Sequence, residues 1–181
     1  MKKLVLLLIF LISYNHSFAN PDIVTALQEG KKLVFIRHAL APGGGDPENF
    51  DLGDCSTQRN LDSSGISQAK RIGQFFNDNN IKIDQVLSSE WCRTQDTAKN
   101  AFKYYKTFNA LNSFFSSKFA KNKDKQMKDL KTFVKKWDSK KNIIFVTHYV
   151  VILETLNTTV GSGEIIVADK NYKVIGTLVI N

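Results

Sequence analysis

The sequence predicts a three-layer α/β/α sandwich, in which a central, mostly parallel sheet lies between helices. Two observations support this fold class. The apolar runs 33–36 and 142–147 are continuous rather than alternating, which is typical of strands covered on both faces. Helical patterns alternate with strand patterns along the chain, as in parallel sheets. With 181 residues, the chain is long enough for one hydrophobic core but short for two.

The first 19 residues predict a secretory signal peptide. Lys2 and Lys3 form a positively charged start, residues 4–12 an apolar core, and residues 17–19 a cleavage site with small side chains. The apolar core is too short to cross a bilayer comfortably. We therefore expect cleavage after Ala19, a single domain at 20–181, no stable membrane span, and a periplasmic or secreted protein. A retained amino-terminal anchor is the alternative.

Charge and cysteine content are weaker indicators. The formal net charge is +8, and loss of the two signal lysines lowers it to +6 (8 − 2). This excess fits an anionic substrate without identifying one. The export expected here permits disulfides, but spacing leaves open whether Cys55 and Cys92 pair or remain thiols. Two cysteines and two histidines at unrelated spacings predict no metal site.

The amino-terminal half predicts a helix, a strand, a helix and a strand. Start and stop signals place a short helix between Pro21 and Gly30. The first strand ends at Arg37 and His38, and the glycine- and proline-rich segment 41–47 then predicts a loop. N-cap candidates at 61–65 precede an amphipathic helix, and residues 83–87 form the second strand after a break at 77–80. The apolar positions of that helix are Ile66, Ala69, Ile72, Gly73 and Phe76.

The carboxyl-terminal half continues the alternation. Residues 90–98 begin a helix with Arg93 in its first turn, where a guanidinium and a helix amino terminus can face the same anion. For residues 102–119 we make no detailed prediction. A lysine-rich surface helix follows, with an apolar stripe at Met127, Leu130, Phe133, Val134 and Trp137. A third buried strand, 142–147, ends at His148, before a helix at 150–156 and a hairpin of 164–169 with 173–180.

Four side chains suited to phosphate chemistry stand at the ends of these elements. His38 and His148 each follow a buried strand, and Arg37 and Arg93 occupy comparable positions. Ligands of parallel sheets bind at the carboxyl ends of the strands, so these groups are expected to converge. Arginine offers a permanently charged fork for phosphate oxygens, and neutral imidazole can attack phosphorus or donate a proton. The pattern predicts a pocket for phosphoryl transfer.

Four segments, in order, resemble the histidine phosphatase superfamily, also called phosphoglycerate mutase-like. They are Phe-Ile-Arg-His at 35–38, the helix start at 61–69, the segment 88–98 around Arg93, and Val-Thr-His at 146–148. The resemblance implies a phosphoglycerate mutase-like fold and attack of His38 on phosphorus to form a phosphohistidine. It also implies that Arg37, Arg93 and His148 hold the phosphate oxygens, with no metal or other cofactor. The implied activity is that of an exported, metal-independent phosphomonoesterase.

The sequence departs from the superfamily pattern at two positions. Ala39 stands where glycine is common, and Tyr149 replaces the aspartate that serves the acid phosphatase and phytase branch as general acid. Asp54 and Glu90 are candidate proton donors, against ordinary capping or solvated roles. Arg59 is a candidate substrate-binding residue, against a structural salt bridge. The compact spacing leaves little room for a large cap insertion, so we expect an open site.

The sequence leaves alternatives open for the substrate and for the class of function. We expect a phosphorylated small molecule or an envelope glycan phosphate. A phosphoglycerate mutase-like phosphotransferase is the enzymatic alternative, and a non-catalytic phosphate- or anion-binding module is the alternative from another class. The basic helix between Lys121 and Lys141 could also dock on nucleic acid or an anionic membrane. Its lysines are simply explained as a solvated face, and we expect no nucleic-acid partner for an exported protein.

Overall fold

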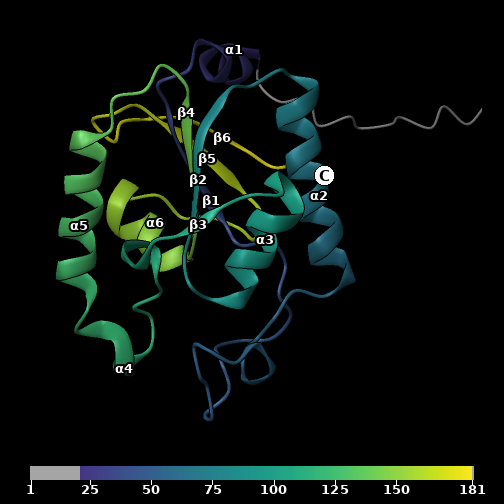
Figure 1. The fold of residues 1–181 in the computed structure, drawn as a ribbon, viewed down its shortest axis with the longest axis vertical. Helices are drawn as coiled ribbons and strands as arrows, with labels where there is room; N and C mark the ends of the chain where they lie inside the picture. The colour runs from purple at the N-terminus through teal and green to yellow at the C-terminus, as the bar shows by residue number, and fades with distance from the viewer. Residues whose placement is uncertain (1–20, 181) are drawn as a thin grey trace, which may run out of the picture.

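The computed structural model describes residues 21–180, and the predicted signal peptide at 1–19 lies outside the described residues. A six-stranded sheet stands between two layers of helices (Figure 1). The helices are α1 (Pro21–Glu29), α2 (Ser63–Asp78), α3 (Cys92–Phe102), α4 (Ser117–Ala120), α5 (Lys123–Lys136) and α6 (Tyr149–Leu156). The strands are β1 (Leu33–Arg37), β2 (Ile83–Ser88), β3 (Lys106–Thr107), β4 (Asn142–Thr147), β5 (Ile165–Ala168) and β6 (Val174–Leu178).

The strand order, β3-β2-β4-β1-β5-β6, confirms the predicted fold class. Strands β3, β2, β4 and β1 are parallel, and β5 is antiparallel to both β1 and β6. The predicted closing hairpin is the β5–β6 pair. Strands β1 and β4 are neighbours, and their register pairs Arg37 with Thr147. The two histidines that follow these residues therefore leave the sheet side by side.

Apolar side chains fill the space on both faces of the sheet. One core joins the sheet to α5 and α6 through residues such as Leu130, Phe145 and Ile152. The other joins it to α1, α2 and α3 through residues such as Leu27, Ile72 and Ala98. All residues of β4 are buried, which explains the continuous apolar run that identified this strand.

The buried face of α2 differs from the prediction at its first turn. Asp62 caps the helix by accepting a hydrogen bond of 2.8 Å from the amide of Gly65. Ala69, Ile72, Gly73 and Phe76 are buried as predicted, but Ile66 is 36% exposed and Gly65 is buried instead. The prediction for Ile66 was wrong because the helix approaches the carbonyl of Leu40 at backbone distance, which leaves room only for glycine.

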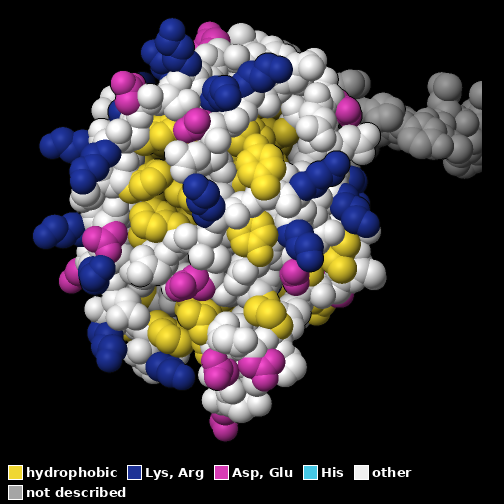
Figure 2. All heavy atoms as spheres, viewed as in Figure 1, with side chains coloured by type: hydrophobic (Ala, Val, Ile, Leu, Met, Phe, Trp, Pro, Cys, Tyr) yellow, Lys and Arg dark blue, Asp and Glu magenta, His cyan; other side chains and the backbone are white. Residues whose placement is uncertain are grey.

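The lysine-rich helix α5 has the predicted stripe. Met127, Leu130 and Val134 are buried, and Phe133 packs against the same core. Trp137 follows the helix, and its indole N–H donates to Asp84 at 2.9 Å. Basic side chains are spread around the visible face of the molecule, with acidic ones between them (Figure 2). This distribution favours a solvated surface over a single docking patch. Within residues 21–180, no helix is long and apolar enough to cross a membrane.

Candidate active site

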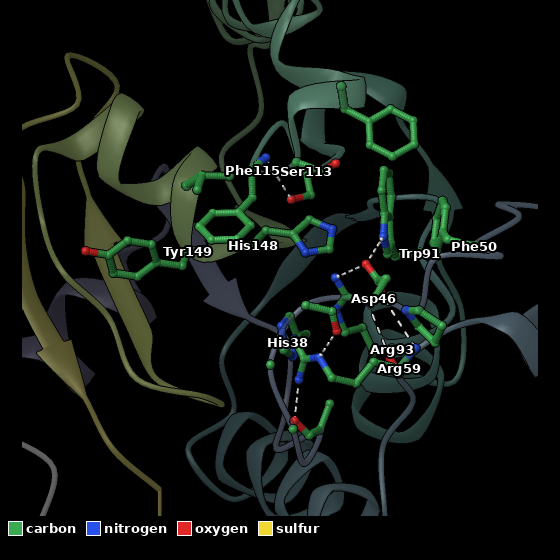
Figure 3. A pocket seen from close by; sticks show the side chains of 18 of the residues that line it. His38, Asp46, Phe50, Arg59, Trp91, Arg93, Ser113, Phe115, His148 and Tyr149 are labelled. Carbon is green, nitrogen blue, oxygen red and sulfur yellow. Dashed lines mark hydrogen bonds and ion pairs between the residues drawn. The ribbon is translucent and has the colours of Figure 1, made fainter.

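All five predicted site residues line one cavity of about 870 Å³ beyond the carboxyl ends of β1 and β4 (Figure 3). They are Arg37, His38, Arg59, Arg93 and His148. The rings of His38 and His148 lie 5.7 Å apart between centroids, and each residue is only 3% exposed. The adjacency of β1 and β4 brings the two histidines together, and the first turn of α3 supplies Arg93.

The backbone sets the tautomer of His38. Its Nδ1 lies 2.8 Å from the carbonyl oxygen of Ala39. A carbonyl only accepts hydrogen bonds, so Nδ1 carries the proton and Nε2 keeps its lone pair. Burial and the positive charge of Arg93 lower the pKa of His38 from 6.5 to about 3, although the Ala39 carbonyl opposes this shift. His38 is therefore a neutral imidazole with a free Nε2 at physiological pH.

His148 is held by the segment that begins α3. Its Nε2 lies 2.8 Å from Ser89 Oγ, which also accepts a hydrogen bond of 3.2 Å from the amide of Trp91. The Ser89 hydroxyl can donate to Nε2, and in this tautomer the imidazole proton lies on Nδ1. Burial, followed by the charge of Arg93, lowers the pKa of His148 well below 6.5. His148 is thus positioned as a neutral hydrogen-bond donor.

Asp46 anchors Arg93, and the sequence analysis missed it. Arg93 Nη1 and Nη2 donate to the two carboxylate oxygens at 2.6 and 3.2 Å, and Trp91 Nε1 donates to the same carboxylate at 3.0 Å. Burial opposes ionisation of Asp46, but the hydrogen bonds and charge of Arg93 outweigh it, so the pKa of Asp46 falls below 3.8. An aspartate between glycine and proline resembles a turn residue, so no local signal reveals this role.

Arg37 is anchored to the backbone. Its Nη1 donates to the carbonyl of Val160 at 2.9 Å, and its guanidinium carbon lies 5.8 Å from the centre of the Tyr149 ring. The Nε groups of Arg37 and Arg93 are buried and have no hydrogen-bond partner in the part of the chain that the structure describes. Buried donors of this kind favour an anionic ligand that can accept from them.

Arg59 lines the cavity but forms no salt bridge within residues 21–180. Its side chain instead donates to the carbonyls of Gly45, at 2.9 Å, and Ala41. Its amide donates to Asp46 Oδ1 at 3.2 Å. The residue therefore ties the glycine-rich loop together while adding positive charge to the cavity. The expectation that Arg59 contacts substrate stays a prediction.

The two candidate proton donors, Asp54 and Glu90, have the ordinary local roles that were the alternative for them. Asp54 is exposed and caps a short 3-10 turn, η1 (Cys55–Thr57), by accepting from the amide of Ser56. Glu90 accepts from Asn112 Nδ2 at 2.5 Å. Neither residue lines the cavity, because their segments turn their side chains toward local partners. Asp46 and Glu48 are the carboxylates that line it.

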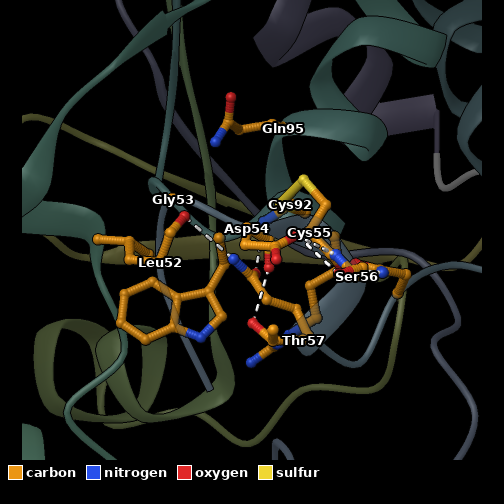
Figure 4. The surroundings of a disulfide bond; sticks show 12 residues. Leu52, Gly53, Asp54, Cys55, Ser56, Thr57, Cys92 and Gln95 are labelled. Atoms are coloured by element: carbon orange, nitrogen blue, oxygen red, sulfur yellow. Dashed lines mark hydrogen bonds between the residues drawn. A yellow bond between two sulfur atoms is a disulfide. The ribbon is translucent and has the colours of Figure 1, made fainter. Parts of the chain in front are cut away.

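The structure resolves the open question of the cysteines. Cys55 and Cys92 form a disulfide, with their Cα atoms 5.7 Å apart (Figure 4). Cys92 is the first residue of α3 and immediately precedes Arg93. The Cys92 amide also donates to Gln58 Oε1 at 2.9 Å. The bond therefore joins the segment after the glycine-rich loop to the helix that presents Arg93.

The cavity wall also includes a group of aromatic residues, which the sequence analysis did not foresee. Phe50 and Trp91 stack with centroids 5.3 Å apart, and Phe119 lies edge-on to Trp91 at the same distance. Phe115 also lines the cavity and is 76% exposed. Phe115 and Phe119 belong to the segment 102–119, whose aromatic residues show no clear period. No set of three or more potential metal ligands of the His, Cys, Asp and Glu types occurs among the described residues.

Comparisons with known proteins bear on the fold. No family model matches the sequence. A curated relative, the mitochondrial serine/threonine-protein phosphatase Pgam5 of Drosophila willistoni, is 33% identical over 85 residues, which are 47% of this chain and only 25% of that protein. The solved structure of the protein histidine phosphatase SixA complexed with tungstate matches with a TM-score of 0.58 and 11% identity, covering 82% of this chain and 96% of that one. The crystal structure of TTHB049 from Thermus thermophilus matches with a TM-score of 0.59 and 15% identity, covering 83% and 96%.

These matches confirm the resemblance at the level of the fold. The architecture is the phosphoglycerate mutase-like one that the ordered motifs predict. The chain therefore has the phosphoglycerate mutase-like fold, with two arginines and two histidines meeting in its cavity.

Proposed function

We propose that the protein is a phosphatase that hydrolyses a phosphomonoester through a phosphohistidine on His38. The observation that carries this proposal is the bond from His38 Nδ1 to the Ala39 carbonyl, which leaves Nε2 unprotonated in a cavity lined by three arginines. A buried neutral imidazole held in one orientation is a competent nucleophile toward phosphorus. Its low pKa keeps it unprotonated even in mildly acidic solution.

The charges of the cavity match a phosphate dianion. The cavity is lined by four positive side chains and two negative ones, so their formal charge is +2 (4 − 2) while both histidines are neutral; they are Arg37, Arg59, Arg93 and Lys118 with Asp46 and Glu48. Preorganised positive charge around the transferring group is the main requirement of phosphoryl transfer. The arginines can meet it without a metal ion, so we propose metal-independent catalysis.

The proposed reaction has two steps. First, the Nε2 lone pair of His38 attacks phosphorus, and the bond from phosphorus to the ester oxygen breaks as the phosphohistidine forms. The leaving oxygen takes a proton from water and departs as an alcohol. Second, water attacks that phosphorus, and inorganic phosphate leaves as the bond to Nε2 breaks. Arg37 and Arg93 hold phosphate oxygens in both steps, and His148 donates its Nδ1 proton to one of them.

The substrate and location are argued from the cavity and the amino-terminal sequence. A volume of about 870 Å³ exceeds the needs of phosphate alone, so the cavity has room for a leaving group such as a sugar or another small molecule. A phosphorylated protein side chain is a second candidate, favoured by the likeness to SixA and Pgam5 and by the exposed Phe115 on the cavity wall. Export is supported by the pattern at 1–19 and by the disulfide.

Intact mass measurement tests the nucleophile. The protein would be quenched rapidly without acid during turnover of 4-nitrophenyl phosphate, beside the His38→Ala and His148→Ala variants. We expect a phosphoryl adduct in the parent protein and none in His38→Ala. The His148→Ala variant should still form the adduct, but more slowly, because it keeps the nucleophile and loses a donor to the transferring group.

The alternatives give different results in the same experiment. Phosphoryl transfer to an added alcohol or sugar hydroxyl, in place of phosphate release, would favour a phosphotransferase. Phosphate binding with neither an adduct nor phosphate release, across a panel of esters, would contradict the phosphatase proposal and favour an anion-binding module.

A further inference from the structure

One irregular segment forms much of the cavity wall. This segment, residues 40–62, is called the cavity loop. It places residues 40–48, Phe50 and Arg59 on the cavity, yet its only regular element is η1. None of its residues pairs with a strand of the described sheet. Its position therefore depends on side-chain contacts and on the disulfide.

Several contacts attach the cavity loop to the start of α3. Asp46 binds Arg93 and Trp91, and Phe50 stacks on the Trp91 ring. Gln58 accepts from the Cys92 amide, while its Nε2 donates to the carbonyls of Asp51 and Leu52 at 3.0 and 3.1 Å. Cys55 is bonded to Cys92. The covalent link thus lies one residue from Arg93 and holds the middle of the loop, between the parts that carry Asp46 and Arg59.

The nucleophile does not depend on this link. The amide of His38 donates to the Thr147 carbonyl on β4 at 2.9 Å, and the side chain of His148 is held by Ser89. Arg37 is anchored to Val160. These contacts come from the sheet and the turns beside it, whereas Arg59 and Asp46 belong to the loop. Release of the cavity loop should therefore lower the affinity for substrate more than it lowers the rate of attack on phosphorus.

We propose that the Cys55–Cys92 disulfide positions the cavity loop for substrate binding, so that affinity for phosphate and phosphoesters falls when the bond is reduced. The turnover part of this inference rests on the proposed phosphatase function. Cys55 is exposed and Cys92 is buried, so a reductant can reach the bond from the side of Cys55. A dithiol would transfer two electrons and two protons, leaving two cysteine thiols and its own disulfide. Both cysteines are positioning residues and take no part in the reaction.

The test compares the oxidised protein with protein that has been reduced by dithiothreitol, after which the dithiothreitol is removed under anaerobic conditions. A Cys55→Ser/Cys92→Ser double variant is measured beside them. Inorganic phosphate binding would be measured by calorimetry, and KM and kcat with 4-nitrophenyl phosphate. We expect the Kd of phosphate and KM to rise together by about tenfold on reduction, while kcat changes by less than about twofold. The double variant should have the Kd and KM of the reduced protein, and dithiothreitol should change neither value.

Thermal unfolding of each form is the control, because loss of a disulfide also lowers stability. All kinetics would be run well below the Tm of the reduced protein, so that an unfolded fraction cannot imitate weak binding. Unfolding of part of the protein lowers the apparent kcat, because less enzyme is active, and leaves KM unchanged. A displaced loop raises KM instead. A lower Tm with unchanged KM and Kd would overturn the proposal and leave the disulfide a purely structural role.

The two readouts separate this inference from the proposed function. Absence of turnover in both forms, with phosphate affinity that falls on reduction, would contradict the phosphatase function and support the positioning role. Turnover with the same KM in the oxidised and reduced protein, together with an unchanged phosphate Kd, would overturn the positioning role. The phosphatase function would then still stand.

Discussion

The chemistry of the cavity depends on a few single contacts. One backbone carbonyl, that of Ala39, decides which nitrogen of His38 keeps its lone pair, and the Ser89 hydroxyl holds the ring of His148 in place. Asp46 has a comparable role for Arg93, whose guanidinium is almost completely buried. Its carboxylate holds both Nη groups, so the orientation of the fork is set before any phosphate arrives.

Replacing Asp46 tests this role. In Asp46→Asn, Arg93 would be a nearly buried cation without its counter-charge. We expect a loss of about 2 kcal/mol in the free energy of unfolding, less than for a fully buried pair because Asp46 is partly exposed. Inorganic phosphate should then raise the Tm of the variant more than that of the parent, since phosphate restores the missing negative charge.

Asp54→Asn is the matched control, because it makes the same chemical change on the same loop at an exposed position without an arginine partner. Its response to phosphate should equal that of the parent. An equal rise of Tm with phosphate in Asp46→Asn and in the parent would contradict the view that Asp46 and phosphate both compensate the charge of Arg93.

Among the elements, α2 links the core to the cavity loop through its first two turns. Gln68 accepts from the Leu40 amide and donates to the Ser162 carbonyl, both at 2.9 Å. A Cβ atom at Gly65 would lie 2.0 Å from the Leu40 carbonyl oxygen, and one at Gly73 would lie 2.0 Å from that of Ala101. The same helix thus has two equally tight contacts, of which only the first lies beside the nucleophile.

This pair gives a prediction with an internal control. Gly65→Ala and Gly73→Ala should each destabilise the protein by about 1–3 kcal/mol, because backbone has to move in both. Only Gly65→Ala should also lower kcat/KM, since it displaces Leu40, two residues from His38. Urea unfolding and steady-state kinetics would be measured on both variants. Equal kcat/KM in the two variants would show that α2 does not position the nucleophile loop.

For the whole molecule, the two buried histidines connect the site to acid stability. Burial lowers the pKa of His38 to about 3 and that of His148 well below 6.5, whereas histidines in the unfolded chain titrate near 6.5. Below about pH 6.5 the unfolded chain therefore binds more protons than the folded one. The free energy of unfolding should fall as the pH decreases from there toward 3, by up to about 1.4 kcal/mol per pH unit from His38, and His148 contributes with the same sign.

Urea unfolding between about pH 7 and pH 4 measures this slope. His38→Gln should reduce it, because one proton-binding group of the unfolded chain is gone. The pKa of Asp46 is also lowered, but from 3.8, so the stability that this carboxylate contributes is complete above about pH 3.8 and is lost only at lower pH. An unchanged slope in His38→Gln would show that His38 titrates normally in the folded protein.

Much of the fold follows from local patterns, and the site follows only in part. The buried strands β1 and β4 are continuous apolar runs, and the histidines after them could be assigned to one edge of a parallel sheet. Asp46, Glu48 and Phe115 could not, because each reaches the cavity through irregular chain whose path depends on distant partners. Ile66 was misplaced because the close approach of α2 to Leu40 is a tertiary contact with no local signal.

The position of the two histidines on neighbouring strands has an evolutionary consequence. Their separation derives from the spacing of adjacent β-strands, about 4.8 Å, which sequence drift hardly alters. The cavity loop and the cavity-lining segment 113–119 lie outside the sheet and obey no such constraint, and insertions in surface segments are tolerated well. Selection could therefore exchange one leaving group for another by remodelling these two segments, while the proposed chemistry at phosphorus is inherited unchanged.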